Sequence, residues 1–576
     1  MGSFLIFGIY VATKYGIIQM NTLNNNKIRI LVYIILFVMI LPLLYYTFNL
    51  RVWGDEVNME VPLVRQWLET GNLFVEPSEH FSEYSYPRLW VIMLYQSLIL
   101  HGEIHEAAGR WLTILIIFLG SAFVWEKFYL KWELNKWISL LWASFWMILV
   151  IVPMFAWSAS WYYSVIVSIL VMISFYYLLV SYDVYSGTRD LKFIVISSIL
   201  MAMVIGIRPD GFLYLPLAIL LLFIQNMKNF RNDIRKNILS ALIIISPSAI
   251  VFFSWRFYLT INSIPMVLDP FKIAGNFSQL FSRMPLVTIE MIRMLKIEWN
   301  QSGFWFICLV LCSIFSIYIF RYLKSNEKQL LFLLTVPVYK FFIMIFENSM
   351  HFTDRVRLGR HLMQTAPILY FLLGFLVLKW INSKFGAFWK DWSHKIRKSI
   401  FSFILLFLFM IHLSIGLLYA YLPSGMNNYI EHWVELIKKD YPEYKQVQMI
   451  YSAKAPPSTR IHPLWRYYAT KTPDIFSELP PLIKELPSNI LFKSRYIDYL
   501  KNNGTDALLI YGADKTIGTL IGLTLDNNKT YLINIGEKDF EIVQFSDISY
   551  PDIWMVPWRM KAINHFKENL LNIVGL

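Results

Sequence analysis

Long apolar runs separated by short polar connections dominate the chain up to residue 422. The runs are too long for soluble strands, and most have the length of a membrane-spanning helix. They predict a polytopic bundle of roughly a dozen helices, with a total of about 11 to 13 spans. The runs cover residues 30–50, 89–101, 110–125, 137–156, 161–182, 192–207, 211–226, 238–260, 302–322, 329–346, 362–381 and 400–422.

Basic residues orient these runs, because short cytoplasmic connections carry an excess of Lys and Arg. The connections around 228–236 and 384–398 are strongly basic, and so is the start of the first run at Lys27 and Arg29. We therefore predict that the first long connection, 51–88, faces outward. Residues 208–210, 261–300, 347–361 and the tail after Leu422 are expected on the same side.

The run at 89–101 conflicts with a simple count. Between Arg88 and Arg110 there is room for one full span or for a short helical dip, but not for both. A full span would reverse the predicted side of the tail, so the basic connections are given more weight than this boundary.

Composition agrees with a membrane protein, since 57% of the 576 residues are hydrophobic and 16% are charged. Soluble domains carry about a quarter charged residues. The net charge of +13 does not indicate nucleic-acid binding, because the excess cations lie in short connections between apolar runs. Cys308 and Cys312 lie four apart in one run and are expected to be buried apolar residues.

The composition changes at Pro423, after which charges, Asn and Pro become frequent and no run is long enough to span. We predict a transmembrane module at 1–422 and a small extracytoplasmic α/β domain at 423–576, a normal domain size. Its predicted helices cover 428–439 and 496–502, and its predicted strands cover 447–451, 507–511 and 541–545.

Two neighbouring carboxylates, Asp55 and Glu56, follow the first span. Apolar residues then recur at Val57, Val61, Val64 and Leu68, which predicts an amphipathic surface helix at 55–70. Adjacent carboxylates repel, so one is expected to titrate high and to act as a general base toward a hydroxyl. The alternative is that both acids only cap the helix and oppose its dipole.

Cationic residues are predicted on the same side. Pro209 breaks the chain between two runs and is expected to leave Arg208 and Asp210 exposed at a helix end. Guanidinium groups suit phosphate oxygens, so a lipid phosphate is a candidate ligand, although arginines that anchor helix ends are an alternative. Further candidates lie just before two other runs: Arg88 precedes the run at 89–101, and Arg357, Arg360 and His361 precede the run at 362–381. Lys340 lies within an apolar run, where a structural ion pair is an equally consistent explanation.

The order of these features resembles the GT-C glycosyltransferases, in particular protein O-mannosyltransferases and the bacterial aminoarabinose transferases that modify lipid A. The resemblance rests on the outward Asp55-Glu56, the amphipathic helix, Tyr86-Pro87-Arg88-Leu89 at the next membrane entry, and 107–112, which read AAGRWL. It covers about residues 30–420 and is strongest over 50–125.

The resemblance implies that Asp55 is the catalytic acid of the first outward loop, with Glu56 beside it. It also implies that Arg357 or Arg360 contacts a lipid phosphate. Relatives have a basic-Pro-Pro-Leu entry where this chain has Tyr86-Pro87-Arg88-Leu89, and the acid they often carry before the fifth span is missing from Ser158–Tyr163. A divalent cation held by both acids is therefore not favoured, and no other cofactor is expected.

The function expected from these features is sugar transfer from a polyprenyl-phosphate donor to an acceptor hydroxyl on a glycan, lipid or protein. The reaction would invert the anomeric carbon and take place on the outer face of the cytoplasmic membrane. The alternative is a transporter or flippase of lipid-linked sugars, whose signature is paired mid-membrane charges and inverted repeats.

Overall fold

The protein is mainly helical and is described here from a computed structural model. The structure describes residues 23–48, 89, 92, 108–155, 162–225, 234–261, 283–290, 304–350, 362–391 and 394–421. In the C-terminal part it describes 437, 439–444, 447–451, 506–511, 530–534 and 542–546. The described part divides into two compact units, a helical one that contains α2 to α16 and most of α17, and one that contains strands β3 to β6.

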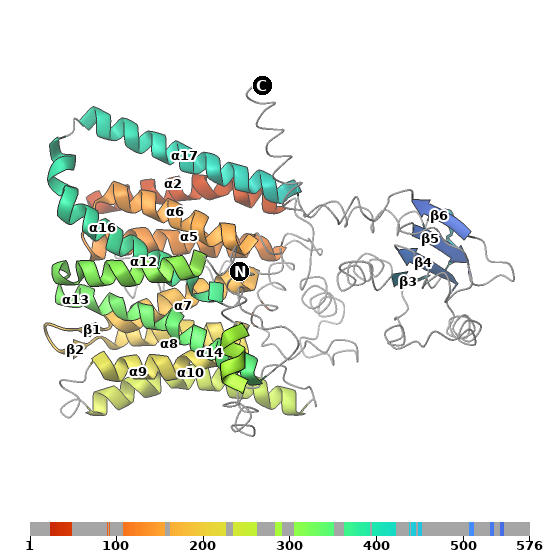
Figure 1. Ribbon diagram of the computed structural model, residues 1–576, viewed down its shortest axis with the longest axis horizontal. Coiled ribbons are helices and arrows are strands. Elements are labelled where there is room, and N and C mark those ends of the chain that lie inside the picture. Colours follow the sequence, from red (N-terminus) through yellow and green to blue (C-terminus); the bar gives the residue numbers. More distant parts are fainter. Residues whose placement is uncertain are drawn as a thin grey trace. The chain divides into compact units, whose positions relative to one another are not determined.

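Eleven longer helices of the described part form the helical unit (Figure 1), and they coincide with eleven of the predicted apolar runs. They are α2 (Leu23–Phe48), α5 (Ala108–Glu126), α6 (Lys136–Phe155), α7 (Tyr162–Val180), α8 (Leu191–Ile207), α9 (Leu215–Gln225), α10 (Ile234–Ile261), α12 (Phe304–Ile319), α14 (Thr335–Met350), α16 (Ala366–Asp391) and α17 (His394–Tyr421).

Shorter elements join or extend these helices. The segment η2 (Lys127–Lys131) is a π-helical extension of α5. Short 3₁₀ segments are η4 (Pro209–Tyr214), η8 (Phe320–Tyr322), η9 (Gln329–Leu334) and η10 (Met363–Thr365), and α13 (Ser325–Lys328) is a single turn. A two-stranded hairpin, β1 (Tyr182–Asp183) with β2 (Thr188–Arg189), connects α7 to α8.

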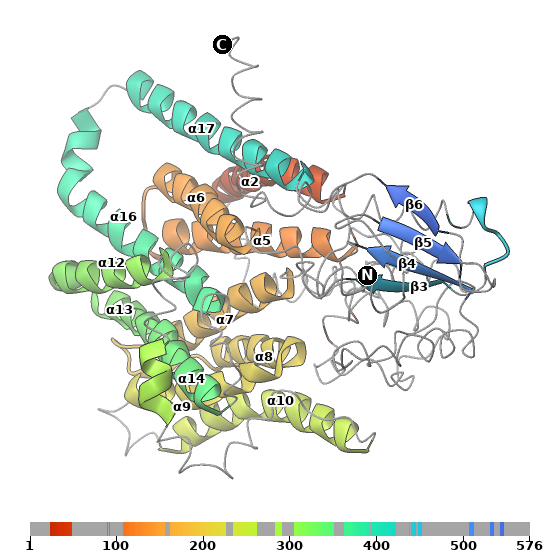
Figure 2. The same ribbon diagram turned by 45° about the vertical axis from the view of Figure 1, so that its right-hand side comes forward.

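The core of the bundle is formed by helices that are apolar on every side. The helix α8 packs against α7 and α10, α5 packs against α2, α6 and α7, and α16 packs against α12, α6 and α7 (Figure 2). Large buried side chains such as Trp125, Trp146 and Trp305 fill the interior. Among the residues that the structure describes, five helical stretches are long and apolar enough to cross a membrane: Lys27–Leu44, Leu112–Lys131, Ile234–Ile261, Trp305–Tyr322 and Ser325–Ile345.

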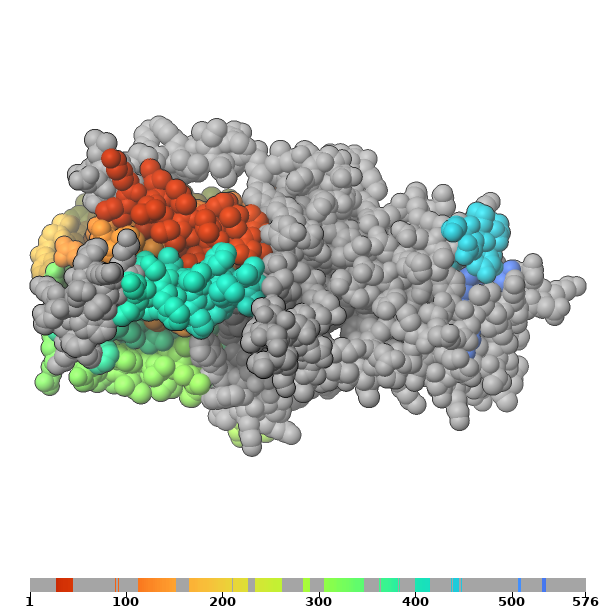
Figure 3. All heavy atoms as spheres, turned by 90° about the horizontal axis from the view of Figure 1, so that it is seen from above, coloured from red at the N-terminus to blue at the C-terminus, as the bar shows by residue number. Residues whose placement is uncertain are grey.

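Helices at the periphery expose apolar side chains, as a lipid-facing surface requires. On α2 the side chain of Ile30 is 59% exposed, and on α17 that of Phe403 is 70% exposed. Figure 3 shows α2 in red and α17 in teal side by side on one face. The cysteines Cys308 and Cys312 are buried and free, as predicted.

Polar contacts tie several connections together at one end of the bundle, which we call the basic end. There Asn326 Nδ2 donates to Asp183 Oδ1 at 3.0 Å, and Gln225 Nε2 donates to the Leu179 carbonyl at 2.9 Å. The basic end takes its name from the cations on these connections: Arg29, Lys127, Lys131, Lys136, Arg189, Lys192, Arg235, Lys236, Arg321, Lys324, Lys328 and Lys379.

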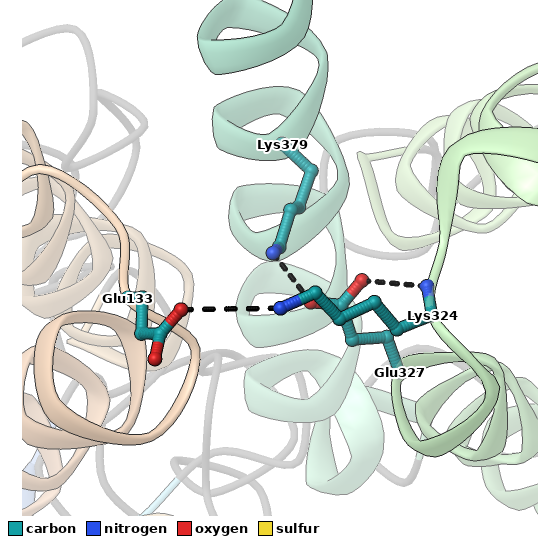
Figure 4. Close-up of polar contacts among 4 residues, drawn as sticks. All are labelled: Glu133, Lys324, Glu327 and Lys379. Carbon is teal, nitrogen blue, oxygen red and sulfur yellow. Dashed lines mark hydrogen bonds and ion pairs between the residues drawn. The ribbon is translucent and has the colours of Figure 1, made fainter.

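A charged cluster fixes α13 to its neighbours at the basic end (Figure 4). Glu327 is 3% exposed, forms an ion pair with Lys379 of α16, and accepts the Lys324 backbone N–H at 2.9 Å. The outer pair of this cluster, Lys324 Nζ and Glu133 Oε2, is 3.9 Å apart and largely exposed. Because an exposed pair contributes little, the Glu327–Lys379 pair is the contact that holds this end together.

The opposite end of the bundle is the one at which α8 reaches Arg208, and we call it the Arg208 end. Arg29 of α2 lies 3.6 Å from Glu126, the last residue of α5. The helix α2 therefore starts at the basic end, so Phe48 and Ala108 both lie at the Arg208 end. Apart from residues 89 and 92, the run at 89–101 and its conflict with the span count lie outside the described residues.

The second unit contains a four-stranded sheet in the order β3-β4-β5-β6. The strands β3 (Val447–Tyr451) and β4 (Ala507–Tyr511) are parallel and have the predicted bounds, and β6 (Ile542–Ser546) lies one residue from its predicted position. The sequence analysis missed β5 (Thr530–Asn534), which pairs antiparallel with β4 and β6. Of the predicted helix at 428–439, residues 437 and 439 are helical, and the predicted helix at 496–502 lies outside the described residues.

Candidate functional site

Arg208 occupies the break between α8 and α9. Its backbone is extended, with φ −139° and ψ 128°, because the following Pro209 disfavours helical geometry at the preceding residue. The Arg208 N–H still donates to the Val204 carbonyl at 2.8 Å, which makes Arg208 the last hydrogen-bonded residue of α8. Proline then starts η4, where its missing N–H costs nothing.

The break folds back on α8 instead of opening to solvent. The Gly211 N–H donates to the Arg208 carbonyl at 3.1 Å and closes the turn. A Cβ on Gly211 would lie 2.7 Å from Val204 Cγ1, so only glycine allows this close approach. As a result Arg208 is 5% exposed, and the prediction that it is exposed at a helix end is wrong. The side chain of Asp210, which is in η4, lies outside the described part.

The start of the run at 89–101 also packs beside this break. A Cβ on Gly206 would lie 3.1 Å from Leu89 Cδ2 and 3.6 Å from Val251 Cγ1. Leu89 directly follows Arg88 in the chain, and Gly206 precedes Arg208 by two residues. The backbone next to Arg88 is thereby near the end of α8.

Lys340 of α14 is fully buried and lies against the far end of η4. Its Nζ is 5.7 Å from the ring centroid of Tyr214, the last residue of η4. The next residue back on α14, Tyr339, donates its hydroxyl to the Leu213 carbonyl at 2.9 Å. A cation held over an aromatic face in a dry interior is stabilised by about 2 kcal/mol. The segment η4 thus has Arg208 at its start and Lys340 over its end.

Chain connectivity assigns the remaining candidates to two connections. Asp55, Glu56 and Arg88 belong to the connection between α2 and α5, and Arg357 and the neighbouring candidates Arg360 and His361 to that between α14 and η10. All six lie outside the described residues, as does the predicted helix at 55–70. Both connections leave the bundle and return to it at the Arg208 end, since α14 runs away from α13 and α16 runs back toward Lys379.

A buried polar residue that the sequence analysis missed lies where the second connection re-enters the bundle. Gln364 of η10 is 2% exposed, and its Oε1 accepts no hydrogen bond from the part of the chain that the structure describes. Its neighbour Thr365 is fixed by a hydrogen bond from Trp305 Nε1 at 3.0 Å. Tyr214 was missed as well, because it lies inside the predicted apolar run at 211–226.

Within the described residues, no group of three or more His, Cys, Asp or Glu side chains is arranged to hold a metal ion. The groups that are brought together at this end are cations and aromatic rings. Such an arrangement can bind an anion at the membrane surface and exclude water from it.

Two solved structures are among those similar to this chain. No family model and no curated protein matches the sequence significantly. ArnT from Cupriavidus metallidurans, an aminoarabinose lipid A transferase solved with undecaprenyl phosphate, is 11% identical, has a TM-score of 0.48, and is matched over 90% of this chain and 98% of its own.

The second is the apo oligosaccharyltransferase of Archaeoglobus fulgidus, which is 12% identical, also with a TM-score of 0.48, over 85% of this chain and 70% of its own.

Proposed function

We propose that this chain is a membrane glycosyltransferase that moves a sugar from a polyprenyl-phosphate donor to an acceptor hydroxyl at the Arg208 end of the bundle. The observation that carries the proposal is the buried Arg208 at the end of α8. The two connections that contain Asp55 and Arg360 leave and re-enter the bundle at this same end. Guanidinium groups suit phosphate oxygens, so Arg208 is our candidate contact for the lipid phosphate.

In this mechanism the acceptor oxygen attacks the anomeric carbon and forms the new glycosidic bond. The bond between that carbon and the phosphate oxygen breaks at the same time, and polyprenyl phosphate leaves with the electron pair. The acceptor proton passes to the Asp55 carboxylate, which acts as the general base. Attack opposite the leaving group inverts the anomeric centre, and the leaving phosphate needs no proton, so one carboxylate is sufficient.

Cations hold the phosphate while this bond breaks. Arg208 has the planar fork that binds two phosphate oxygens, and Lys340 adds a second positive charge deeper in the bundle. Arg88, Arg357 and Arg360 are further phosphate or substrate contacts in this proposal, and so are the nearby His361 and Asp210. Charge on the phosphate increases in the transition state, so contacts that strengthen with it accelerate the step.

The basic end is assigned to the cytoplasm in this proposal, because positively charged connections stay on that side. The Arg208 end then faces outward, and with it the proposed active site. The C-terminal domain at 423–576 is proposed to be outside as well, as the sequence predicts. A domain in that position is suited to selecting the acceptor.

The experiment is a transfer assay with the purified full-length chain and a panel of labelled polyprenyl-phosphate sugars. Release of polyprenyl phosphate is measured with and without a membrane-glycan acceptor extract. We expect acceptor-dependent release that Asp55→Asn abolishes while expression and melting temperature are kept. Asp183→Asn, which changes a carboxylate at the basic end, is the matched control and should remain active. An Asp55→Asn enzyme as active as this control would remove the mechanism.

Lys340 gives a specific reason to keep a second candidate, a carrier of lipid-linked sugars. A cation that is fully buried in a membrane helix often marks a substrate path. The same preparation tests this candidate in vesicles that hold a fluorescent lipid-linked sugar. A carrier moves the lipid between leaflets without cleaving it, whereas the transferase cleaves it only when the acceptor is present.

A further inference from the structure

The basic end contains a buried ionic cluster that the proposed sugar transfer does not use. Arg29 of α2 and Glu126 of α5 face each other with 3.6 Å between Nε and Oε1, and their side chains are 7% and 9% exposed. Tyr33, one helical turn after Arg29, donates its hydroxyl to the same Glu126 oxygen at 2.5 Å. Glu126 Oε1 therefore accepts a hydrogen bond from Tyr33, whereas its contact with Arg29 is a longer ionic one.

The arginine is left with unmet donors. Among the described residues, no acceptor hydrogen-bonds Arg29 Nε or Nη1, although both atoms are buried. A guanidinium has five N–H donors and suits acceptors with two oxygens side by side. Buried polar groups are normally hydrogen-bonded, so this guanidinium is built for a partner that is an anion with several oxygens.

The surroundings of Arg29 favour a negative ligand. Lys127 Nζ lies 5.2 Å from the ring centroids of Phe123 and Tyr177, so it is held against aromatic faces. Arg29, Glu126 and Lys131 all lie near enough to act electrostatically on Lys127. Three cations against one carboxylate leave the seam between α2 and α5 with a net positive charge.

The depth of the seam identifies the source of the anion as a lipid. Arg29 is the third residue of the apolar stretch Lys27–Leu44, where the bilayer interface and its phosphates are expected. The neighbouring Ile30 and Ile34 are 59% and 54% exposed, as expected for side chains that face acyl chains. Basic pockets between helix ends on the cytoplasmic side are known to suit anionic headgroups.

We propose that the seam between α2 and α5 binds the phosphate of an anionic phospholipid, such as phosphatidylglycerol, from the leaflet at the basic end. Arg29 supplies the two donors and Lys131 the nearby exposed charge, while Lys127 keeps the seam positive. This lipid is distinct from the sugar donor, which binds at the opposite end. The site does not depend on the chain being a transferase.

The test is native mass spectrometry of the full-length chain, delipidated and titrated with phosphatidylglycerol or with phosphatidylcholine of the same acyl chains. We expect preferential retention of phosphatidylglycerol and a loss of about tenfold in its affinity in Arg29→Gln, the factor that corresponds to one charged hydrogen bond. Lys27→Gln is the matched control, because Lys27 is an exposed cation on the same helix, two positions from Arg29, and it should bind as the wild type does.

Glu126→Gln separates a lipid site from a merely structural arginine. Among the described residues, Glu126 is the one carboxylate of the seam, so phosphatidylglycerol should bind more tightly in this variant, whereas structural damage would weaken binding. If Arg29→Gln does not fold, the exposed Lys131→Gln takes its place and should also lose affinity. Equal binding of the two lipids, equal binding by the Arg29 and Lys27 variants, or displacement of the lipid by millimolar inorganic phosphate would overturn the proposal.

Discussion

Gly211→Ala tests whether the η4 fold-back positions Arg208. The new Cβ would lie 2.7 Å from Val204 Cγ1, 3.1 Å from the Ile205 backbone nitrogen and 3.2 Å from the Val204 carbonyl carbon. Carbon atoms in contact are normally about 3.5–4.0 Å apart, so the first contact is roughly 1 Å too short. Val204 is fully buried and has no room to turn away, so η4 must move outward.

Overpacking of this kind lowers the free energy of unfolding by about 1–3 kcal/mol. The displacement also lengthens the 3.1 Å hydrogen bond from the Gly211 N–H to the Arg208 carbonyl. Because a shift of about 1 Å at a positioning residue can cost up to about a hundredfold in rate, we expect transfer to fall more than stability alone would suggest.

A double-mutant cycle with Val204→Ala makes the argument quantitative. Val204→Ala alone removes two buried methyl groups and costs about 1.5 kcal/mol. In the double variant Cγ1 is absent, so the cost of Gly211→Ala should shrink, while the two backbone contacts above 3.0 Å keep the rescue partial. Apparent melting temperature in detergent and acceptor-dependent release of polyprenyl phosphate are measured for all four proteins. Additive losses, or wild-type activity in Gly211→Ala, would refute the reasoning.

Further predictions concern the other charged groups. Lys340→Met should lower transfer at least about tenfold with little change in melting temperature, since a well-packed apolar residue can replace a buried charge; a large loss of stability would instead identify a structural ion pair. Glu327→Gln should lower the free energy of unfolding by about 3–5 kcal/mol, because it leaves Lys379 of the buried pair uncompensated. In the same denaturation series, Glu133→Gln at the exposed pair should change that free energy by no more than about 0.5 kcal/mol. Hydrogen bonds from Asn326 and Ser186 hold the pKa of Asp183 below its usual 3.8. Asp183 therefore stabilises the hairpin above pH 3.8 and loses this effect as pH falls through its lowered pKa. Hydrogen exchange of the hairpin amides, corrected for intrinsic rates, should be faster at pH 3 than at pH 5. Asp183→Asn should show no such pH dependence.

The sequence predicts the helices well, because apolar length is a strong signal in a membrane protein. The run at 192–207 corresponds to α8, and the proline at 209 marks the break after Arg208. The run at 329–346 is less well predicted, since it divides into η9 and α14. A 3₁₀ and an α segment of equal hydrophobicity look alike in a sequence.

The faces of these helices could not be predicted from periodicity. In water an apolar stripe marks the buried side, but lipid is as apolar as the core, so both sides of a spanning helix read alike. On α2, Ile34 is 54% exposed and Leu36 is fully buried, yet both are aliphatic. The fold-back that buries Arg208 was missed for a related reason, because it depends on Gly211 meeting α8 in space.

The charged pairs were equally invisible, since their members are far apart in the chain. Arg29 and Glu126 are joined only through the packing of α2 on α5. Glu327 meets Lys379 from another helix. The connections that contain Asp55 and Arg360, by contrast, follow from the alternation of the predicted apolar runs, so the sequence alone identifies them.

The length of η4 bears on how donor binding should depend on ionic strength. At about 2 Å of rise per residue its six residues descend about 12 Å from Arg208, and the 11 residues of α9 add about 16 Å. Together they match the roughly 30 Å hydrocarbon layer, so Arg208 lies at the headgroup level and Lys340 well below it. Mobile ions weaken attraction at the headgroup level but scarcely reach the deeper ammonium. Added salt should therefore weaken donor binding in wild-type protein and have a smaller effect in Arg208→Gln, which lacks one of the proposed charges at the headgroup level.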